Sequence, residues 1–176
     1  ISAVADVCND APAFNITAVD AGGTWSGQGV NASGTFAPNS VPPATYSITY
    51  SIGGACPDSD TQTIVVLPVP DGTITPAGPF CQDVLPQTLT AASTGGTWSG
   101  TGITSSANGT FGASNTPAGN YSITYTTPGA CSNSFNQIVQ VIENLNATIG
   151  SSGPFCEDAS PYTLTAASPG GVWSGT

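Results

Sequence analysis

Apolar and polar residues alternate with a period of two in several short stretches of the chain, and no stretch has a sustained helical period. In residues 46–50 the two Tyr and the Ile share one face while Ser and Thr share the other, and residues 121–125 repeat this pattern. Clusters of Gly, Pro, Asn and Ser separate such stretches about every eight to twelve residues, which is typical of β-sandwiches. The pattern therefore predicts an all-β protein.

The same set of short motifs occurs along the chain in the same order. Gly-Gly-Thr-Trp-Ser-Gly at 22–27 recurs at 95–100 and, with Val in place of Thr, at 170–175. Each Trp lies 17 residues after a Cys. In the first two copies a Gly-Thr-Phe motif, a Tyr-Ser-Ile-Thr-Tyr motif and a second Cys follow, with an offset of 75 residues between copies. The chain is therefore a tandem repeat.

These landmarks divide the chain into a first repeat at 1–69, a second at 70–143 and the N-terminal half of a third at 144–176. Half a sandwich cannot bury its apolar face, so we expect the parent chain to continue with the rest of the third repeat. The junctions are short, and the one at 67–71 carries two Pro and should be stiff. Stiff junctions between like modules predict an extended rod.

The order Cys…Trp…Cys within each complete repeat is similar to that of an immunoglobulin domain, so we expect tandem Ig-like β-sandwich modules with one disulfide each. The predicted bonds are Cys8–Cys56 and Cys81–Cys131, tying loops at one end of each module. Closing a loop of this length stabilises a domain by about 4 kcal/mol in the chain-entropy model. Cys156 would pair with a residue further along the parent chain. Disulfides predict an oxidising, extracellular location.

The chain has no Lys, Arg or His, against ten Asp and Glu. Binding to nucleic acid or to anionic lipid depends on cationic side chains, so neither is expected. Ser and Cys nucleophiles usually require a His or Lys base, which leaves only carboxylate-pair chemistry, and we expect no enzyme. No run of 18 apolar residues is present, so no direct membrane insertion is expected.

Two sets of residues invite a functional interpretation. The predicted Cys8–Cys56 bond would bring four acidic residues of the first repeat together, and such a cluster is a speculative Ca²⁺ site; no other cofactor is expected. The second repeat lacks most of this cluster. The Trp of each repeat could stack on a sugar, but its recurrence favours a structural position in the core. The residues concerned are Asp6, Asp10, Asp58 and Asp60 for Ca²⁺, and Trp25, Trp98 and Trp173 for the core.

The motifs together resemble repeats of very large cell-surface adhesins of gliding and related bacteria, the SprB-like proteins exported by the type IX secretion system. The resemblance covers the whole chain and rests on the Trp, Gly-Thr-Phe, Tyr-Ser-Ile-Thr-Tyr and Gly-Ala-Cys motifs and on the Pro-Phe-Cys start of later copies. It implies an extracellular filament on the cell surface that carries adhesion and, in gliding cells, is moved along the surface.

Two functions from different classes follow from these observations. In the first, the repeats are a rigid structural spacer in a secreted adhesive filament, and their partners are neighbouring repeats of the same chain. In the second, each repeat binds a surface polysaccharide or a protein, and the array supplies avidity. A surface Trp beside a groove would favour the second function, and a buried Trp in each copy would favour the first.

Overall fold

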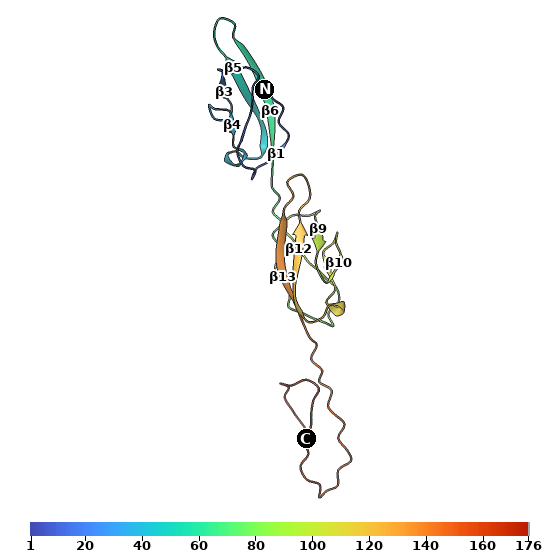
Figure 1. Ribbon diagram of the computed structural model, residues 1–176. Helices are drawn as coiled ribbons and strands as arrows, with labels where there is room; N and C mark the ends of the chain where they lie inside the picture. The colour runs from blue at the N-terminus through green and yellow to red at the C-terminus, as the bar shows by residue number, and fades with distance from the viewer. Residues whose placement is uncertain (176) are drawn as a thin grey trace.

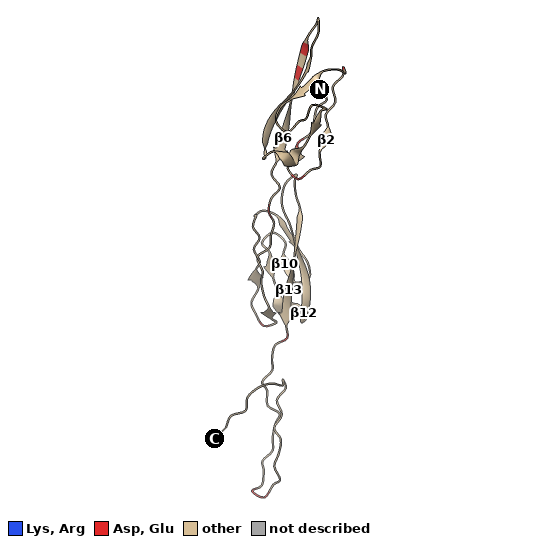
Figure 2. Ribbon diagram, turned by 90° about the vertical axis from the view of Figure 1, so that its left-hand side faces the viewer, with Lys and Arg blue, Asp and Glu red and all other residues tan. Residues whose placement is uncertain are grey.

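The computed structural model describes residues 1–175 and shows two β-sandwich modules and a third segment arranged in line (Figure 1). Figure 2 shows the same extended arrangement from the side, with acidic residues sparse along it. The strands of module 1 are β1 (Val7–Cys8), β2 (Phe14–Asn15), β3 (Thr24–Ser26), β4 (Thr35–Phe36), β5 (Ala44–Ile52) and β6 (Asp58–Leu67). Those of module 2 are β7 (Phe80–Cys81), β8 (Gln87–Thr88), β9 (Thr97–Ser99), β10 (Ile103–Ser105), β11 (Thr110–Phe111), β12 (Gly119–Thr126) and β13 (Ser134–Ile142).

Each module is built around one long antiparallel hairpin, β5–β6 in module 1 and β12–β13 in module 2. The hairpin forms the centre of a four-stranded sheet with the order β1-β6-β5-β3 or β7-β13-β12-β9. A smaller sheet faces it, with the order β2-β4 in module 1 and β10-β11-β8 in module 2. Short 3₁₀ turns, η1 (Pro38–Ser40) and η2 (Ala113–Asn115), lead into the hairpins. The predicted all-β, Ig-like sandwich array is confirmed.

The two modules differ between the Trp motif and the Gly-Thr-Phe motif. Trp25 and Gly34 are separated by nine positions, whereas Trp98 and Gly109 are separated by eleven. The longer segment of module 2 forms β10, which pairs with β11. In module 1 the corresponding segment makes only a single bridge, Val30 to Phe36.

Period-two alternation places the apolar face of each hairpin in the core. In module 2 the side chains of Ile123, Tyr125, Val139 and Val141 are buried against Trp98. The indole of Trp98 lies 4.7 Å from the Tyr125 ring, and the Trp25 and Tyr50 rings of module 1 lie at the same distance. Burial of aromatic surface is the main source of stability in cores this small.

The Gly-Gly pair of the Trp motif is fixed to the hairpin by a Tyr hydroxyl. The Tyr125 hydroxyl donates to the Ser93 carbonyl at 2.8 Å and accepts from the Gly96 N–H at 2.9 Å. Tyr50 makes the same two bonds in module 1, to Asp20 and from Gly23. A Cβ on Gly96 would lie 2.2 Å from the Thr126 carbonyl oxygen, so only glycine fits beneath this Tyr. The repeated motif is therefore a packing motif.

Replacing Tyr125 by Phe should destabilise module 2 by about 1–3 kcal/mol, because the buried Gly96 N–H loses its acceptor. Tyr121→Phe is the matched control, because its hydroxyl donates at an exposed site, to the Pro117 carbonyl. It should cost less than about 1 kcal/mol. Urea unfolding of the two variants measures both values, and equal losses would contradict the described role of Tyr125.

The third copy, from residue 144 to residue 175, follows the course of the first part of the other modules without forming a sandwich. Its one strand-like pairing is the bridge between Ile149 and Ala166, which matches the bridge between Ile74 and Ala91. Its apolar side chains are open to solvent: Trp173 is 50% exposed and Phe155 is 56% exposed. The strands that cover these positions in module 2 come from the later part of the repeat.

Candidate functional site: the junction between modules 1 and 2

The first Cys of module 1 lies at the end of the module that faces module 2. It lies there because β1 pairs in parallel with the last two residues of β6, so Cys8 stands opposite Leu67. The Asn9 N–H donates to the Leu67 carbonyl at 2.9 Å. The Asn9 side-chain amide donates to the carbonyls of Pro38 and Val41. Cys8 is thus held beside the start of the linker, at a fixed place on the module.

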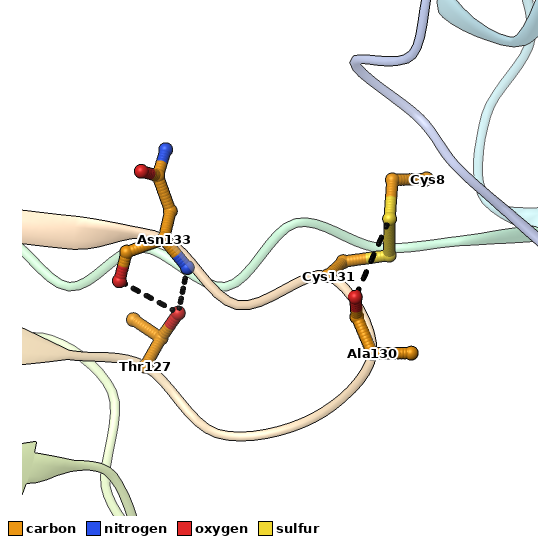
Figure 3. The surroundings of a disulfide bond; sticks show 5 residues. All are labelled: Cys8, Thr127, Ala130, Cys131 and Asn133. Carbon is orange, nitrogen blue, oxygen red and sulfur yellow. Dashed lines mark hydrogen bonds between the residues drawn. A yellow bond between two sulfur atoms is a disulfide. The ribbon is translucent and has the colours of Figure 1, made fainter.

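The linker packs on the loop end of the module 2 hairpin. Gly72 is buried, and a Cβ on it would lie 2.5 Å from the Phe135 ring and 2.6 Å from the Thr127 methyl. The loop that joins β12 to β13 is closed beside this contact, where the Asn133 N–H donates to the Thr127 hydroxyl at 2.8 Å. Cys131 lies in this loop (Figure 3).

A disulfide joins Cys8 of module 1 to Cys131 of module 2 (Figure 3). The two Cα atoms are 5.5 Å apart, and the residues are 123 positions apart in the sequence. Cys131 is 7% exposed, since the bond brings the end of module 1 over it. The linker and the disulfide are two covalent connections across one junction, and together they restrict bending and rotation of one module against the other.

The predicted pairs Cys8–Cys56 and Cys81–Cys131 are wrong. Cys8 lies beside the last residue of β6, whereas Cys56 lies just before its first residue, Asp58. A strand of this length separates them by roughly 25 Å or more, at about 3.3 Å per residue. Disulfides require Cα atoms within about 7 Å. The two cysteines of module 1 thus lie at opposite ends of the sandwich. The same holds in module 2, where Cys81 stands opposite the last residue of β13 and Cys131 lies just before its first.

The remaining cysteines of the described residues are free thiols. Cys56 and Cys156 are exposed, and Cys81 is half-buried at the far end of module 2. The prediction of one disulfide within each module is therefore replaced by one disulfide between two modules.

The acidic residues proposed for Ca²⁺ are not brought together. Asp58 and Asp60 lie on β6 near the hairpin loop, while Asp6 and Asp10 flank β1 at the opposite end of the module. The cluster depended on the Cys8–Cys56 bond, which the structure does not contain. Within residues 1–175, no group of three or more His, Cys, Asp or Glu side chains is placed to hold a metal ion.

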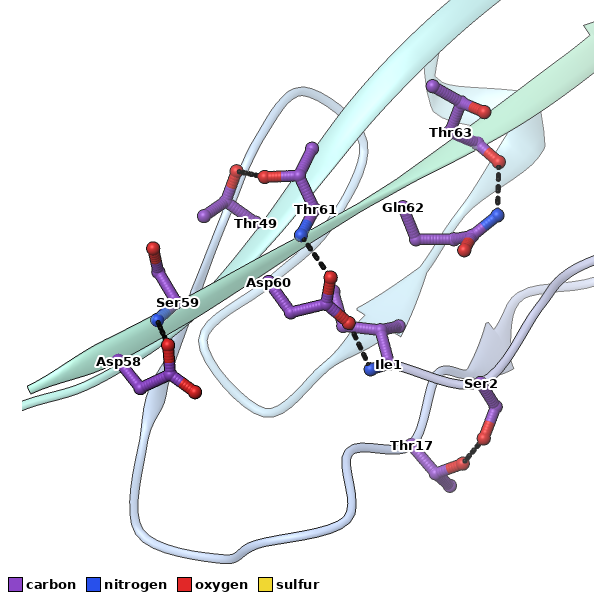
Figure 4. Close-up of polar contacts among 10 residues, drawn as sticks. All are labelled: Ile1, Ser2, Thr17, Thr49, Asp58, Ser59, Asp60, Thr61, Gln62 and Thr63. Atoms are coloured by element: carbon purple, nitrogen blue, oxygen red, sulfur yellow. Dashed lines mark hydrogen bonds and ion pairs between the residues drawn. The ribbon is translucent and has the colours of Figure 1, made fainter.

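Asp60 has a different partner. Its carboxylate accepts a hydrogen bond from the Ile1 ammonium, and Figure 4 shows the pair beside the neighbouring Asp58, which accepts from the Ser59 N–H. The hydrogen bond from the ammonium lowers the pKa of Asp60. Asp60 is fully exposed, so solvent screens this pair and it is a weak contact.

Asp71 shapes the linker on the module 2 side of the junction. Its Oδ1 accepts from the Thr73 N–H at 2.9 Å and from the Thr73 hydroxyl at 2.6 Å, which forms an Asx turn. Both hydrogen bonds lower the pKa of Asp71, and the bond from the Thr73 hydroxyl has the larger effect. Asn146 makes the corresponding bond to the Thr148 N–H at the next junction, so the turn requires a side-chain oxygen and not a charge.

Asp71→Asn should therefore keep the turn, and Asp71→Ala should lose it, with faster hydrogen exchange at the Thr73 amide. Because the folded pKa of Asp71 lies below the ordinary 3.8, its stabilising effect is present above that value. The effect is lost as the pH falls through the folded pKa. Thermal melting across this acid range should show a larger loss in the unmodified chain than in Asp71→Asn, which keeps only the losses from other carboxylates such as Asp60. A parallel response of the two would contradict the turn.

The three Trp residues lie in different surroundings. Trp98 is buried in the core of module 2, and Trp25 is half-buried against the core of module 1. Trp173 of the third copy lines an open apolar groove with Leu145, Ile149 and Leu164. In module 2 the positions equivalent to Ile149, Leu164 and Trp173 are Ile74, Leu89 and Trp98, all of which are buried core residues. The groove is therefore an uncovered core and not a ligand site of the complete repeat.

No family model and no curated protein matches the chain. Among solved structures, Drosophila N-cadherin EC1-4 matches 82% of this chain at 15% identity and a TM-score of 0.44. Human CDH23 EC21-23 matches 93% at 17% identity and a TM-score of 0.37. The chain covers 48% of the N-cadherin fragment, about half of its length, and 81% of the CDH23 fragment. Likenesses at this level of identity and TM-score assign no function.

Sequence reasoning identified the cysteines but not their partners. A signal was present for the second Cys of each repeat, because it follows a Gly-Ala pair in the turn between two alternating strands. The parallel register of β1 on β6, which decides at which end the first Cys lies, has no signature in the residue pattern.

Among the described residues, no helix is both long and apolar enough for a membrane span.

Proposed function

We propose that this chain is a rigid structural spacer in a secreted, adhesive cell-surface filament. The observation that carries the proposal is the Cys8–Cys131 bond, which closes the junction of two sandwich modules that lie in line. A flexible binding array needs no such bond, whereas a spacer that holds a distant binding site away from the cell depends on stiff junctions. Disulfides persist in oxidising surroundings, which supports an extracellular location.

The burial of Trp98 and the half-burial of Trp25 also favour a spacer over a sugar-binding array. The resemblance to adhesin repeats of gliding bacteria supports a role in adhesion and gliding, with export by the type IX secretion system. In this proposal the partners of each module are its neighbours along the chain, and adhesion to polysaccharide or protein belongs to other parts of the filament.

Small-angle X-ray scattering tests the spacer directly. The oxidised chain should have the maximum dimension of modules in line and a narrow distribution of shapes. The Cys8→Ser/Cys131→Ser variant should bend at the junction and show a broader distribution with a shorter mean length. A folded, oxidised chain whose modules lie side by side would contradict the proposal, and so would an unchanged distribution in the variant.

A further inference from the structure

Cys81 repeats the local structure of Cys8. It stands opposite Ile142, the last residue of β13, as Cys8 stands opposite the last residue of β6. The Gln82 N–H donates to the Ile142 carbonyl at 3.2 Å, and the Gln82 side-chain amide donates to the Thr116 carbonyl. These bonds match those of Asn9 in module 1. The thiol of Cys81 is thus held at the end of module 2 that faces the third copy. Cys8 lies at the equivalent end of module 1, which faces module 2.

Cys56 repeats the position of Cys131. It lies in the loop that joins β5 to β6, after a Gly-Ala pair, as Cys131 does in the loop that joins β12 to β13. Cys131 is 7% exposed beneath module 1, and Cys56 is an exposed free thiol at the other end of the array. Neither Cys56 nor Cys81 can reach the other Cys of its own module, because the length of the hairpin separates the two.

The junction after module 2 begins as the junction after module 1 does. The Asn146 side chain accepts from the Thr148 N–H, as the Asp71 side chain accepts from the Thr73 N–H. The Ala167 N–H donates to the Thr148 carbonyl, as the Ala92 N–H donates to the Thr73 carbonyl. The chain therefore enters the third copy along the same path by which it enters module 2. A hairpin loop in a complete copy at this place would lie against Cys81 as the Cys131 loop lies against Cys8.

We propose that the first Cys of each repeat forms a disulfide with the second Cys of the following repeat, so that every junction of a longer array is closed in the same staggered way. The partner of Cys81 is then the hairpin-loop Cys of a following complete copy, and the partner of Cys56 is the first Cys of a preceding copy. Each bond forms when two thiols lose two protons and two electrons to a disulfide oxidant, such as oxidised glutathione, which is reduced to two thiols.

The test extends the full chain at its N-terminus by a copy of residues 74–148, which supplies a complete module 2 and its following linker. The original part carries Cys81→Ser and the added copy carries Cys131→Ser. The added copy then keeps only its Cys81, and the original part keeps Cys8, Cys56, Cys131 and Cys156. After oxidation with glutathione, free thiols are alkylated and the unreduced chain is digested with proteases that cut beside acidic and aromatic residues.

The expected result is two linked peptide pairs, added Cys81 with Cys56 and Cys8 with Cys131, with Cys156 alkylated. The Cys8–Cys131 bond reports that the modules are folded and docked. If the Cys8–Cys131 bond forms but Cys56 and the added Cys81 are both alkylated, the proposal is overturned. A Cys56–Cys56 bond between two chains would overturn it as well. Loss of Cys8–Cys131 itself would overturn the structural basis of the proposal. In the matched control the added copy also carries Cys81→Ser, and Cys56 should be fully alkylated. These outcomes are independent of the bending measured by scattering.

Discussion

Replacing Trp98 by Ala should destabilise module 2 by about 3–5 kcal/mol, the usual cost of removing a large buried aromatic side chain. The side chain is 6% exposed and packs on Tyr125 and on Gly109, where a Cβ would lie 2.8 Å from the indole. A module of this size is stable by about 4–11 kcal/mol at 0.05–0.15 kcal/mol per residue. Trp98→Ala should therefore bring module 2 close to unfolding.

Hydrogen exchange measured by mass spectrometry separates the modules in this experiment. Protection should fall in β12 and β13 and stay high in β5 and β6, because the two cores are separate. Trp173→Ala is the matched control, since this Trp of the third copy is 50% exposed. It should change stability by less than about 0.5 kcal/mol. Equal effects of the two substitutions would show that Trp98 is not the core residue described here.

The second large effect is expected from the disulfide. Cys8→Ser/Cys131→Ser opens a ring of more than a hundred residues. In the chain-entropy model this lowers the free energy of unfolding of the two joined modules by about 4–5 kcal/mol. Urea unfolding of the oxidised chain and the double variant measures the difference.

Cys56→Ser/Cys81→Ser is the matched control, because these residues occupy the equivalent repeat positions but are free thiols in this chain. The control should unfold as the unmodified chain does, within about 0.5 kcal/mol. If the control lost as much stability as the Cys8/Cys131 variant, the bonds would lie within the modules and the junction would be open.

The fold could be predicted from the residue pattern because each part of it has a local cause. Alternation in residues 46–50 and 121–125 marks the hairpin strands, and Gly and Pro clusters mark the turns. Gly96, two residues before Trp98, lies where the Thr126 carbonyl and the Tyr125 ring leave no room for a side chain. Local geometry of this kind leaves a direct trace in the sequence.

The pairing of the cysteines could not be predicted because it depends on where the ends of strands lie in space. A pairing count allows Cys8 to bond to Cys56 as readily as to Cys131. Only the parallel register of Val7 and Cys8 on β6 places Cys8 at the junction end of the module. The four acidic residues proposed for Ca²⁺ are separated for the same reason, since Asp6 and Asp10 lie with Cys8 at that end while Asp58 and Asp60 lie at the other.

The central claim is that the junction is closed by a disulfide between modules, and a peptide map of the unreduced chain tests it most directly. Free thiols are alkylated first, and the chain is then digested beside acidic and aromatic residues, because it contains no Lys or Arg. The predicted result is one linked pair, Cys8 with Cys131, and alkylated Cys56, Cys81 and Cys156. Linked pairs of Cys8 with Cys56 and of Cys81 with Cys131 would contradict it.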